Sequence, residues 1–366
     1  MTVLLILGFG PEITADLSMN LPYQNPPIEP QDLAPLLIEE LDALASHSNS
    51  SSEFVGLVKT HTDGLKTALC AEQQEKLAEK VKAVLDFVSG HIIPTAKDVQ
   101  FRVDLNDVNQ NSLWELGRAA LAAHGVFIVD NYFSAEQIDR AQNELSQIEK
   151  VARKQFELGE FLETDQLIVD HPVEPRITGF HNRARSGKCY VFSRPEEDSG
   201  IVEVVNVERA CPTIKRFVQP KLTTSEIIEA LNHGASSTEL QPRHLNAYIN
   251  ATNPATRGLH LDTQRWCAKG FLYLTDVDDI ADGPFAYVPG THVTTSPMKR
   301  LCIRYNEQIR GLKSPRNLEM DLQSAEYSYP VLAKRGTFII GYTCGIHRGM
   351  PRIGDTRREV LIQNYF

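Results

Sequence analysis

The chain has fewer basic than acidic residues, and this imbalance limits the classes of molecule that it is expected to bind. Lys and Arg number 37 against 47 Asp and Glu, which leaves a formal net charge of -10, and no block of basic residues breaks the pattern. A protein that binds nucleic acid through the phosphates needs a basic surface to displace counterions. The composition therefore argues against a nucleic-acid partner.

The N-terminal region lacks the features of a targeting segment. Its apolar run, residues 3–7, is too short to span a membrane. No Lys or Arg precedes Lys59, so the positively charged start of a secretory signal and the Arg-rich composition of a transit peptide are both missing. The sequence predicts a cytoplasmic protein with no membrane partner.

The six cysteines are too scattered for a disulfide framework. No two of them form a C-x-x-C pair in a chain of 366 residues. A small secreted scaffold has a denser pattern, so we expect reduced, mostly buried thiols. With 42% hydrophobic and 23% charged residues, the composition is that of a globular protein.

The N-terminal apolar run carries only part of a dinucleotide-binding motif. Residues 2–10 predict a buried strand that ends in Gly8-Phe9-Gly10. Ile13 occupies the place of the third glycine of the fingerprint, and no alternation of strands and helices follows. These gaps argue against a nicotinamide-dependent enzyme.

Helical periodicity dominates the rest of the first hundred residues. Apolar residues recur at helical spacing across 31–45, 53–69 and 71–89. We expect these helices to form a layer that packs on the main domain. The predicted division is an N-terminal strand plus helical extension over 1–99 and a core domain over 100–366.

The pattern becomes strand-rich in the C-terminal part of the chain. A helix is expected over 112–124, a buried strand over 126–129, and a second helix after its capping residue Ser134. From residue 243 onward, short apolar or aromatic runs alternate with Gly, Pro, Asn and Asp. This pattern predicts a mainly β fold with α additions, built as a sheet sandwich or small barrel. The expected strands are 245–249, 270–274, 285–288, 337–342 and 360–365.

Two short segments supply residues with the chemistry of metal ligands. His260 and Asp262 stand two apart in a strand-like run, so their side chains point to the same face. An apolar run over 336–346 leads into His347. Two imidazoles and one carboxylate on one face form the facial triad of non-haem iron(II) oxygenases. We predict a metal site at these three residues, with open positions for a chelating 2-oxoacid and for O₂.

An arginine soon after the second histidine fits the same chemistry. Arg358 begins the last predicted strand, and its neighbour Arg357 is expected to point to the other face. A dicarboxylate that chelates a metal at one end needs a cation for its distal carboxylate. A guanidinium supplies that pairing through two parallel hydrogen bonds.

The stretch between the two ligand segments carries a motif of its own. It reads Asp-Gly-Pro-Phe-x-x-Val-Pro-Gly-Thr-His over 282–292. Together with the H-x-D of 260–262, the run His347-Arg-Gly and Arg358, this motif resembles the phytanoyl-CoA dioxygenase family. The resemblance is strongest over residues 243–366.

That resemblance implies both a fold and an activity. The fold is a double-stranded β-helix, the jelly-roll or cupin-like core, flanked by helices. The family's members are oxygenases that use Fe(II), 2-oxoglutarate and O₂, so His260, Asp262 and His347 match their metal ligands and Arg358 their 2-oxoglutarate clamp. The implied reaction oxidises, and most simply hydroxylates, an unactivated C–H bond of a small-molecule substrate, with release of succinate and CO₂. We expect a role in specialised-metabolite biosynthesis for a monomer or homodimer.

Several outcomes stay open at this point. Desaturation, epoxidation and cyclisation start from the same centre, and a non-catalytic jelly-roll protein would bind a ligand without turnover. Halogenases that resemble the family lack the carboxylate ligand, so Asp262 argues against halogenation. The absence of a basic patch disfavours a CoA ester and favours a small natural-product intermediate.

Other residues near these motifs depart from the family or have weaker claims. Many relatives carry Gln where this chain has Arg257, which we assign as a hypothesis to the near carboxylate of 2-oxoglutarate, and some carry Thr in place of Phe285. His292 is interpreted as a loop residue bonded to backbone, and Tyr248 as a packing residue. Loop residues 176–182 are the place to look for substrate contacts, with no residue assigned.

Overall fold

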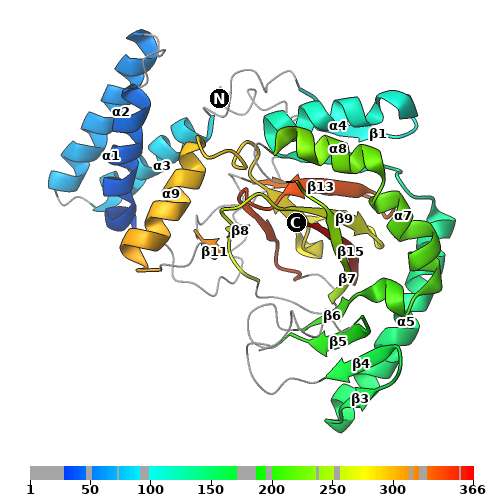
Figure 1. The fold of residues 1–366 in the computed structure, drawn as a ribbon. Helices are drawn as coiled ribbons and strands as arrows, with labels where there is room; N and C mark the ends of the chain where they lie inside the picture. Colours follow the sequence, from blue (N-terminus) through cyan, green and yellow to red (C-terminus); the bar gives the residue numbers. More distant parts are fainter. Residues whose placement is uncertain are drawn as a thin grey trace.

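The computed structural model describes most of the chain (Figure 1). The N-terminal strand expected over 2–10 and the loop 176–182 lie outside the described residues. None of the helices in the described part combines the length and the hydropathy that a membrane span requires. The described ranges are 29–46, 52–71, 74–90, 99–170, 187–194, 200–235, 239–250, 256–312, 316–320, 328–353 and 356–366.

Eight strands of the C-terminal half form the core, and consecutive strands alternate between two sheets except for the fourth and fifth, which pair within the smaller sheet. The pairs nest within one another, so that the first strand lies beside the eighth, the second beside the seventh, and so on, each pair antiparallel. This nesting defines a double-stranded β-helix, as predicted. The larger sheet takes β7 (Pro242–Asn250), β9 (Ala268–Tyr273), β13 (Phe338–Tyr342) and β15 (Arg358–Tyr365). The smaller sheet takes β8 (His260–Thr263), β10 (Phe285–Tyr287), β12 (Tyr329–Pro330) and β14 (His347–Gly349).

Further strands extend both sheets beyond this core. The larger sheet reaches ten strands, with β1 and β2 at one edge and β6 to β3 at the other, and the smaller sheet gains β11 beside β8. These additions are β1 (Arg102–Asp104), β2 (Val126–Asp130), β3 (Leu162–Glu163), β4 (Leu167–Asp170), β5 (Cys189–Ser193), β6 (Ile201–Val205) and β11 (Arg316–Glu319).

The larger sheet separates two apolar layers. Alternation along β9 and β15 sends Leu272 and Leu361 into the cluster under the helices, and Phe271 and Ile362 into the space between the sheets. The helices on the outer face bury the first cluster, with α4 and α8 over β13 and β9 in Figure 1. They are α4 (Gln110–His124), α5 (Ala135–Leu158), α7 (Gln219–Leu222) and α8 (Ser225–Gly234).

The N-terminal helices pack against α9 and the outer face of the smaller sheet. They bury Leu37 and Leu65 in one cluster with Leu301 of α9 and Leu261 of β8. Figure 1 shows them grouped beside α9. A boundary at residue 99 stays a proposal, because this cluster contains residues from both sides of it. The elements are α1 (Pro30–Ala45), α2 (Ser52–Cys70), α3 (Gln74–Gly90) and α9 (Pro297–Arg304).

The described chain contains more helix than the predicted mainly β fold with α additions implies. Three of them precede the core, and α5 alone spans 24 residues, from a capping box at Ser134 to a left-handed Gly159. The described chain is therefore mixed α and β in content, although its core is the predicted jelly roll.

A buried carboxylate ties α1 to α9, and its removal tests the packing of the helical layer. Glu40 is 0% exposed, accepts a hydrogen bond from Nε of Arg300 at 2.8 Å and forms an ion pair with Arg304 at 3.1 Å, whereas Glu39 pairs with Arg304 with half its side chain in solvent. Glu40→Ala should lower the free energy of unfolding by about 3 kcal/mol, because the partly buried guanidinium of Arg300 loses its carboxylate partner and Arg304 keeps only the exposed Glu39. The matched Glu39→Ala should cost less than about 1 kcal/mol. Equal losses in urea unfolding would contradict this packing.

Candidate metal centre

The smaller sheet brings the three predicted ligands together. His260 on β8 lies directly opposite His347 on β14, and their ring centroids are 4.6 Å apart. Asp262, two residues along β8, faces the same side. One potential ligand atom from each of the three lies within 4.8 Å of the others. The sequence spacing and the strand pairing together therefore create a compact group of two nitrogens and one oxygen.

Backbone carbonyls orient both histidines. Nδ1 of His260 lies 2.8 Å from the Gly258 carbonyl oxygen, and Nδ1 of His347 lies 2.9 Å from that of Gly345. A carbonyl only accepts, so Nδ1 carries the hydrogen and Nε2 carries the lone pair. The Nε2 atoms lie 3.7 Å and 3.8 Å from the Asp262 carboxylate oxygens. This is how histidine ligands are held in metal sites.

The protonation states of the three residues also suit a metal. Burial lowers the pKa of His347 to about 4 and that of His260 well below its usual value. Burial would raise the pKa of Asp262, but Lys269 and the nearby imidazoles outweigh it and hold that pKa far below normal. At neutral pH the site offers two neutral imidazoles and one carboxylate, a donor set that fits a divalent transition metal.

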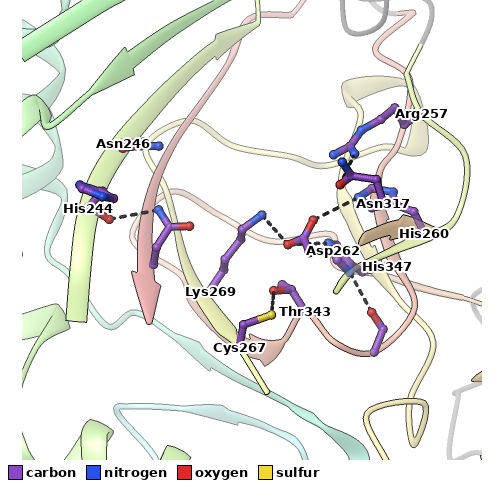
Figure 2. A network of polar contacts seen from close by, with 12 residues as sticks. His244, Asn246, Arg257, His260, Asp262, Cys267, Lys269, Asn317, Thr343 and His347 are labelled. Carbon is purple, nitrogen blue, oxygen red and sulfur yellow. Dashed lines mark hydrogen bonds and ion pairs between the residues drawn. The ribbon is translucent and has the colours of Figure 1, made fainter. Parts of the chain in front are cut away.

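A lysine beside the centre was missed by sequence reasoning. Lys269 reaches across from β9 of the larger sheet, and its Nζ lies 2.7 Å from Oδ2 of Asp262 (Figure 2). The only sequence feature that could have located Lys269 is the period-two alternation, which places it on the same face of its strand as Phe271 and Tyr273. Sequence alone gave no sign that this face meets a carboxylate of the other sheet.

A pocket opens between the sheets beside the triad, and its charge differs from that of the whole chain. Arg194, Arg257, Lys269 and Arg358 line it together with His260 and His347, and none of the described lining residues is a carboxylate. Apolar side chains form the rest of the wall. The pocket is therefore locally positive although the whole chain has a formal net charge of -10.

The two predicted cosubstrate arginines both line this pocket. Arg358 is 7% exposed and begins β15, and a side chain added at Gly349 would meet its Nη2 at 3.5 Å, which places the guanidinium close to β14. Arg257 precedes β8, and its Nη1 donates to Oδ1 of Asn317 at 3.4 Å. Arg357 turns the other way and pairs with Glu149, as the alternation predicts.

Of the other residues singled out in the sequence, His292 bonds to backbone as interpreted, whereas Phe285 and Tyr248 line the pocket. His292 places Nε2 3.3 Å from the Ala122 carbonyl oxygen, as interpreted from sequence, and its ring stacks on Tyr342. Phe285 stacks on Phe271 at 4.2 Å between ring centroids, so it contributes to the apolar wall near the centre. Tyr248, interpreted as packing, lines the pocket.

Comparison with known proteins yields only distant structural similarity. No family model and no curated protein matches the chain. The epimerase SnoN, in complex with Fe3+, alpha ketoglutarate and nogalamycin RO, is 13% identical over 70% of this chain and 84% of that chain, with a TM-score of 0.41. The carbocyclase SnoK from nogalamycin biosynthesis is 12% identical over 71% and 84%, with a TM-score of 0.42. HygX from Streptomyces hygroscopicus, with nickel and 2-oxoglutarate bound, is 11% identical over 70% and 87%, with a TM-score of 0.41. Similarity this low carries no argument, so the interpretation rests on the topology and the site.

Acid should weaken the fold through His292, whose pKa burial lowers from 6.5 to about 4. Between these values the unfolded chain binds a proton at this imidazole and the folded chain does not, so stability falls as the pH falls. The total loss is on the order of 3 kcal/mol, complete near pH 4. Urea unfolding at about pH 7.5 and about pH 4.5 should show a smaller pH dependence in His292→Asn than in the wild type. An unchanged dependence would contradict the buried, neutral assignment.

Proposed function

We propose that this chain is an Fe(II)/2-oxoglutarate-dependent dioxygenase related to the phytanoyl-CoA dioxygenase family. It would hydroxylate an unactivated C–H bond of a small organic substrate in specialised-metabolite biosynthesis. The observation that carries the proposal is the convergence of two neutral histidines and one carboxylate beside a cation-lined pocket of a jelly roll. A 2-His-1-carboxylate set with open positions is the ligand set of non-haem iron(II) oxygenases.

Each residue of the site has a defined part in this proposal. His260, Asp262 and His347 would hold the iron from one side, which leaves the pocket side open to ligands. Arg358 would pair with the distal carboxylate of 2-oxoglutarate, and Arg257 with the near one. Bound iron(II), with 2-oxoglutarate and O₂, supplies the oxidising chemistry and yields succinate and CO₂.

The pocket walls would decide which bond is oxidised. Phe271, Phe285, Val360 and Ile362 line it and keep water away from the reacting carbon. Desaturation, epoxidation or cyclisation would use the same metal ligands and differ in how the substrate lies against these walls. Hydroxylation is proposed as the simplest outcome of the shared centre.

Anaerobic spectroscopy tests the assembled centre. Apo-protein given iron(II) and then 2-oxoglutarate should develop a weak visible charge-transfer band that requires both. His260→Ala should lose the band, because a ligand nitrogen is gone. His244→Ala is the matched control, since His244 bonds to Asn206 and is not among the residues that line the pocket. If iron and 2-oxoglutarate both fail to bind the wild type, a non-catalytic jelly-roll binding protein becomes the better account.

Two arginine variants test the cosubstrate assignment. Arg358→Gln should weaken 2-oxoglutarate binding by about 30-fold or more, because a buried, charge-assisted pair is lost. Its neighbour Arg357→Gln should leave that affinity unchanged, because Arg357 turns toward Glu149. Arg257→Ala should weaken binding several-fold, and an unchanged dissociation constant would refute its role. Iron binding, titrated in parallel, should survive in all three variants.

A further inference from the structure

The ammonium group of Lys269 has more donors than the described residues satisfy. An ammonium carries three N–H donors. The described part of the chain gives it a single acceptor, Oδ2 of Asp262 at 2.7 Å, and its side chain is only 20% exposed. Lys269 lines the pocket beside the triad, so its remaining N–H donors are at the wall of that pocket. A nearly buried cation with open donors at a cavity wall is the arrangement of an anion-binding residue.

The charge stays on Lys269 despite its burial. Its Nζ lies 2.7 Å from Oδ2 of Asp262, and a carboxylate at this distance favours the charged ammonium over the neutral amine.

The other pocket cations already have partners, observed or proposed. Nε of Arg194 donates to Oε2 of Glu203 at 2.8 Å, and its Nη2 donates to the Tyr248 hydroxyl at 2.7 Å. Under the proposed function, on which this step rests, Arg358 and Arg257 each take one carboxylate of 2-oxoglutarate. The double positive charge of iron(II) then cancels the double negative charge of 2-oxoglutarate. The charge of Arg194 likewise cancels that of Glu203. The four pocket cations then exceed the two carboxylates, Glu203 and Asp262, by two charges (4 − 2 = 2), so the loaded pocket keeps an excess of positive charge.

We propose that Lys269 binds an acidic group of the substrate, a carboxylate or a phosphate. The ammonium lies in contact with a metal-ligand carboxylate, so the acidic group would sit next to the centre. The oxidised C–H bond would then be only a few bonds away from it. The substrate class is a small organic acid whose reactive carbon lies close to its charged end.

Binding of simple anions to the loaded protein tests this proposal. Zinc-loaded protein saturated with 2-oxoglutarate does not turn over, and it leaves the remaining donors of Lys269 available to an added anion. Inorganic phosphate and acetate, titrated separately by calorimetry, should each reveal whether a site exists and which acid it prefers. Lys269→Met should weaken the preferred anion by about tenfold or more, and Lys269→Arg should retain it. Lys334→Met is the control, because Lys334 is 66% exposed and pairs with Asp276 and Asp278.

A second readout separates this role from a folding defect. Removing the cation beside Asp262 should tighten zinc binding in Lys269→Met, because the metal no longer competes with the ammonium for the carboxylate. Tighter metal and weaker anion binding together support the proposal. Equal anion affinity in wild type and Lys269→Met, or no binding of either anion, overturns it while the proposed function stands. Failure of the wild type to bind zinc or 2-oxoglutarate overturns both.

Discussion

The antiparallel pairing of β8 with β14 is the constraint on which the site depends. It places His260 opposite His347, and the period of two along β8 then adds Asp262 to the same face. A shift of one residue in this pairing would turn the ligands to opposite faces. The register is secured by the neighbouring pairs, since β10 pairs with β14 on the other side and sets Tyr287 against His347. The outer face of β8 contributes Leu261 to the cluster under the N-terminal helices, so the helical layer packs directly behind the strand that carries two residues of the candidate metal centre.

The distribution of charge follows from the two-sheet architecture. Acidic residues outnumber basic ones over the whole chain, yet the described lining of the pocket holds four cations and no carboxylate. Lys269 and Arg358 lie on β9 and β15 of the larger sheet, Arg194 follows β5, and Arg257 precedes β8. Net charge reports on solubility and on long-range partners. It is therefore a poor guide to the chemistry of an enclosed cavity.

Much of the core could be predicted because its signals are local. The strand expected over 126–129 is β2, and the helix expected after Ser134 starts with the capping box that its sequence encodes. The triad could be located because strand alternation fixes which residues share a face. Strands β3 to β6 and the role of Lys269 could not, because they depend on pairing between distant segments, such as Glu203 against Tyr248. A lysine in an apolar strand most often faces solvent, and only the tertiary fold shows that this one meets Asp262.

The main-chain acceptors behind the two histidines affect how substitutions can change the site. Gly258 and Gly345 hold the imidazoles through carbonyl groups, which every amino acid possesses. A side-chain acceptor would be lost by one substitution, whereas these two persist for as long as the local backbone path does. The walls of the cavity are made of side chains and have no such protection. Substitutions in the cavity walls can therefore change which molecules fit without removing the two carbonyl acceptors that hold the histidines.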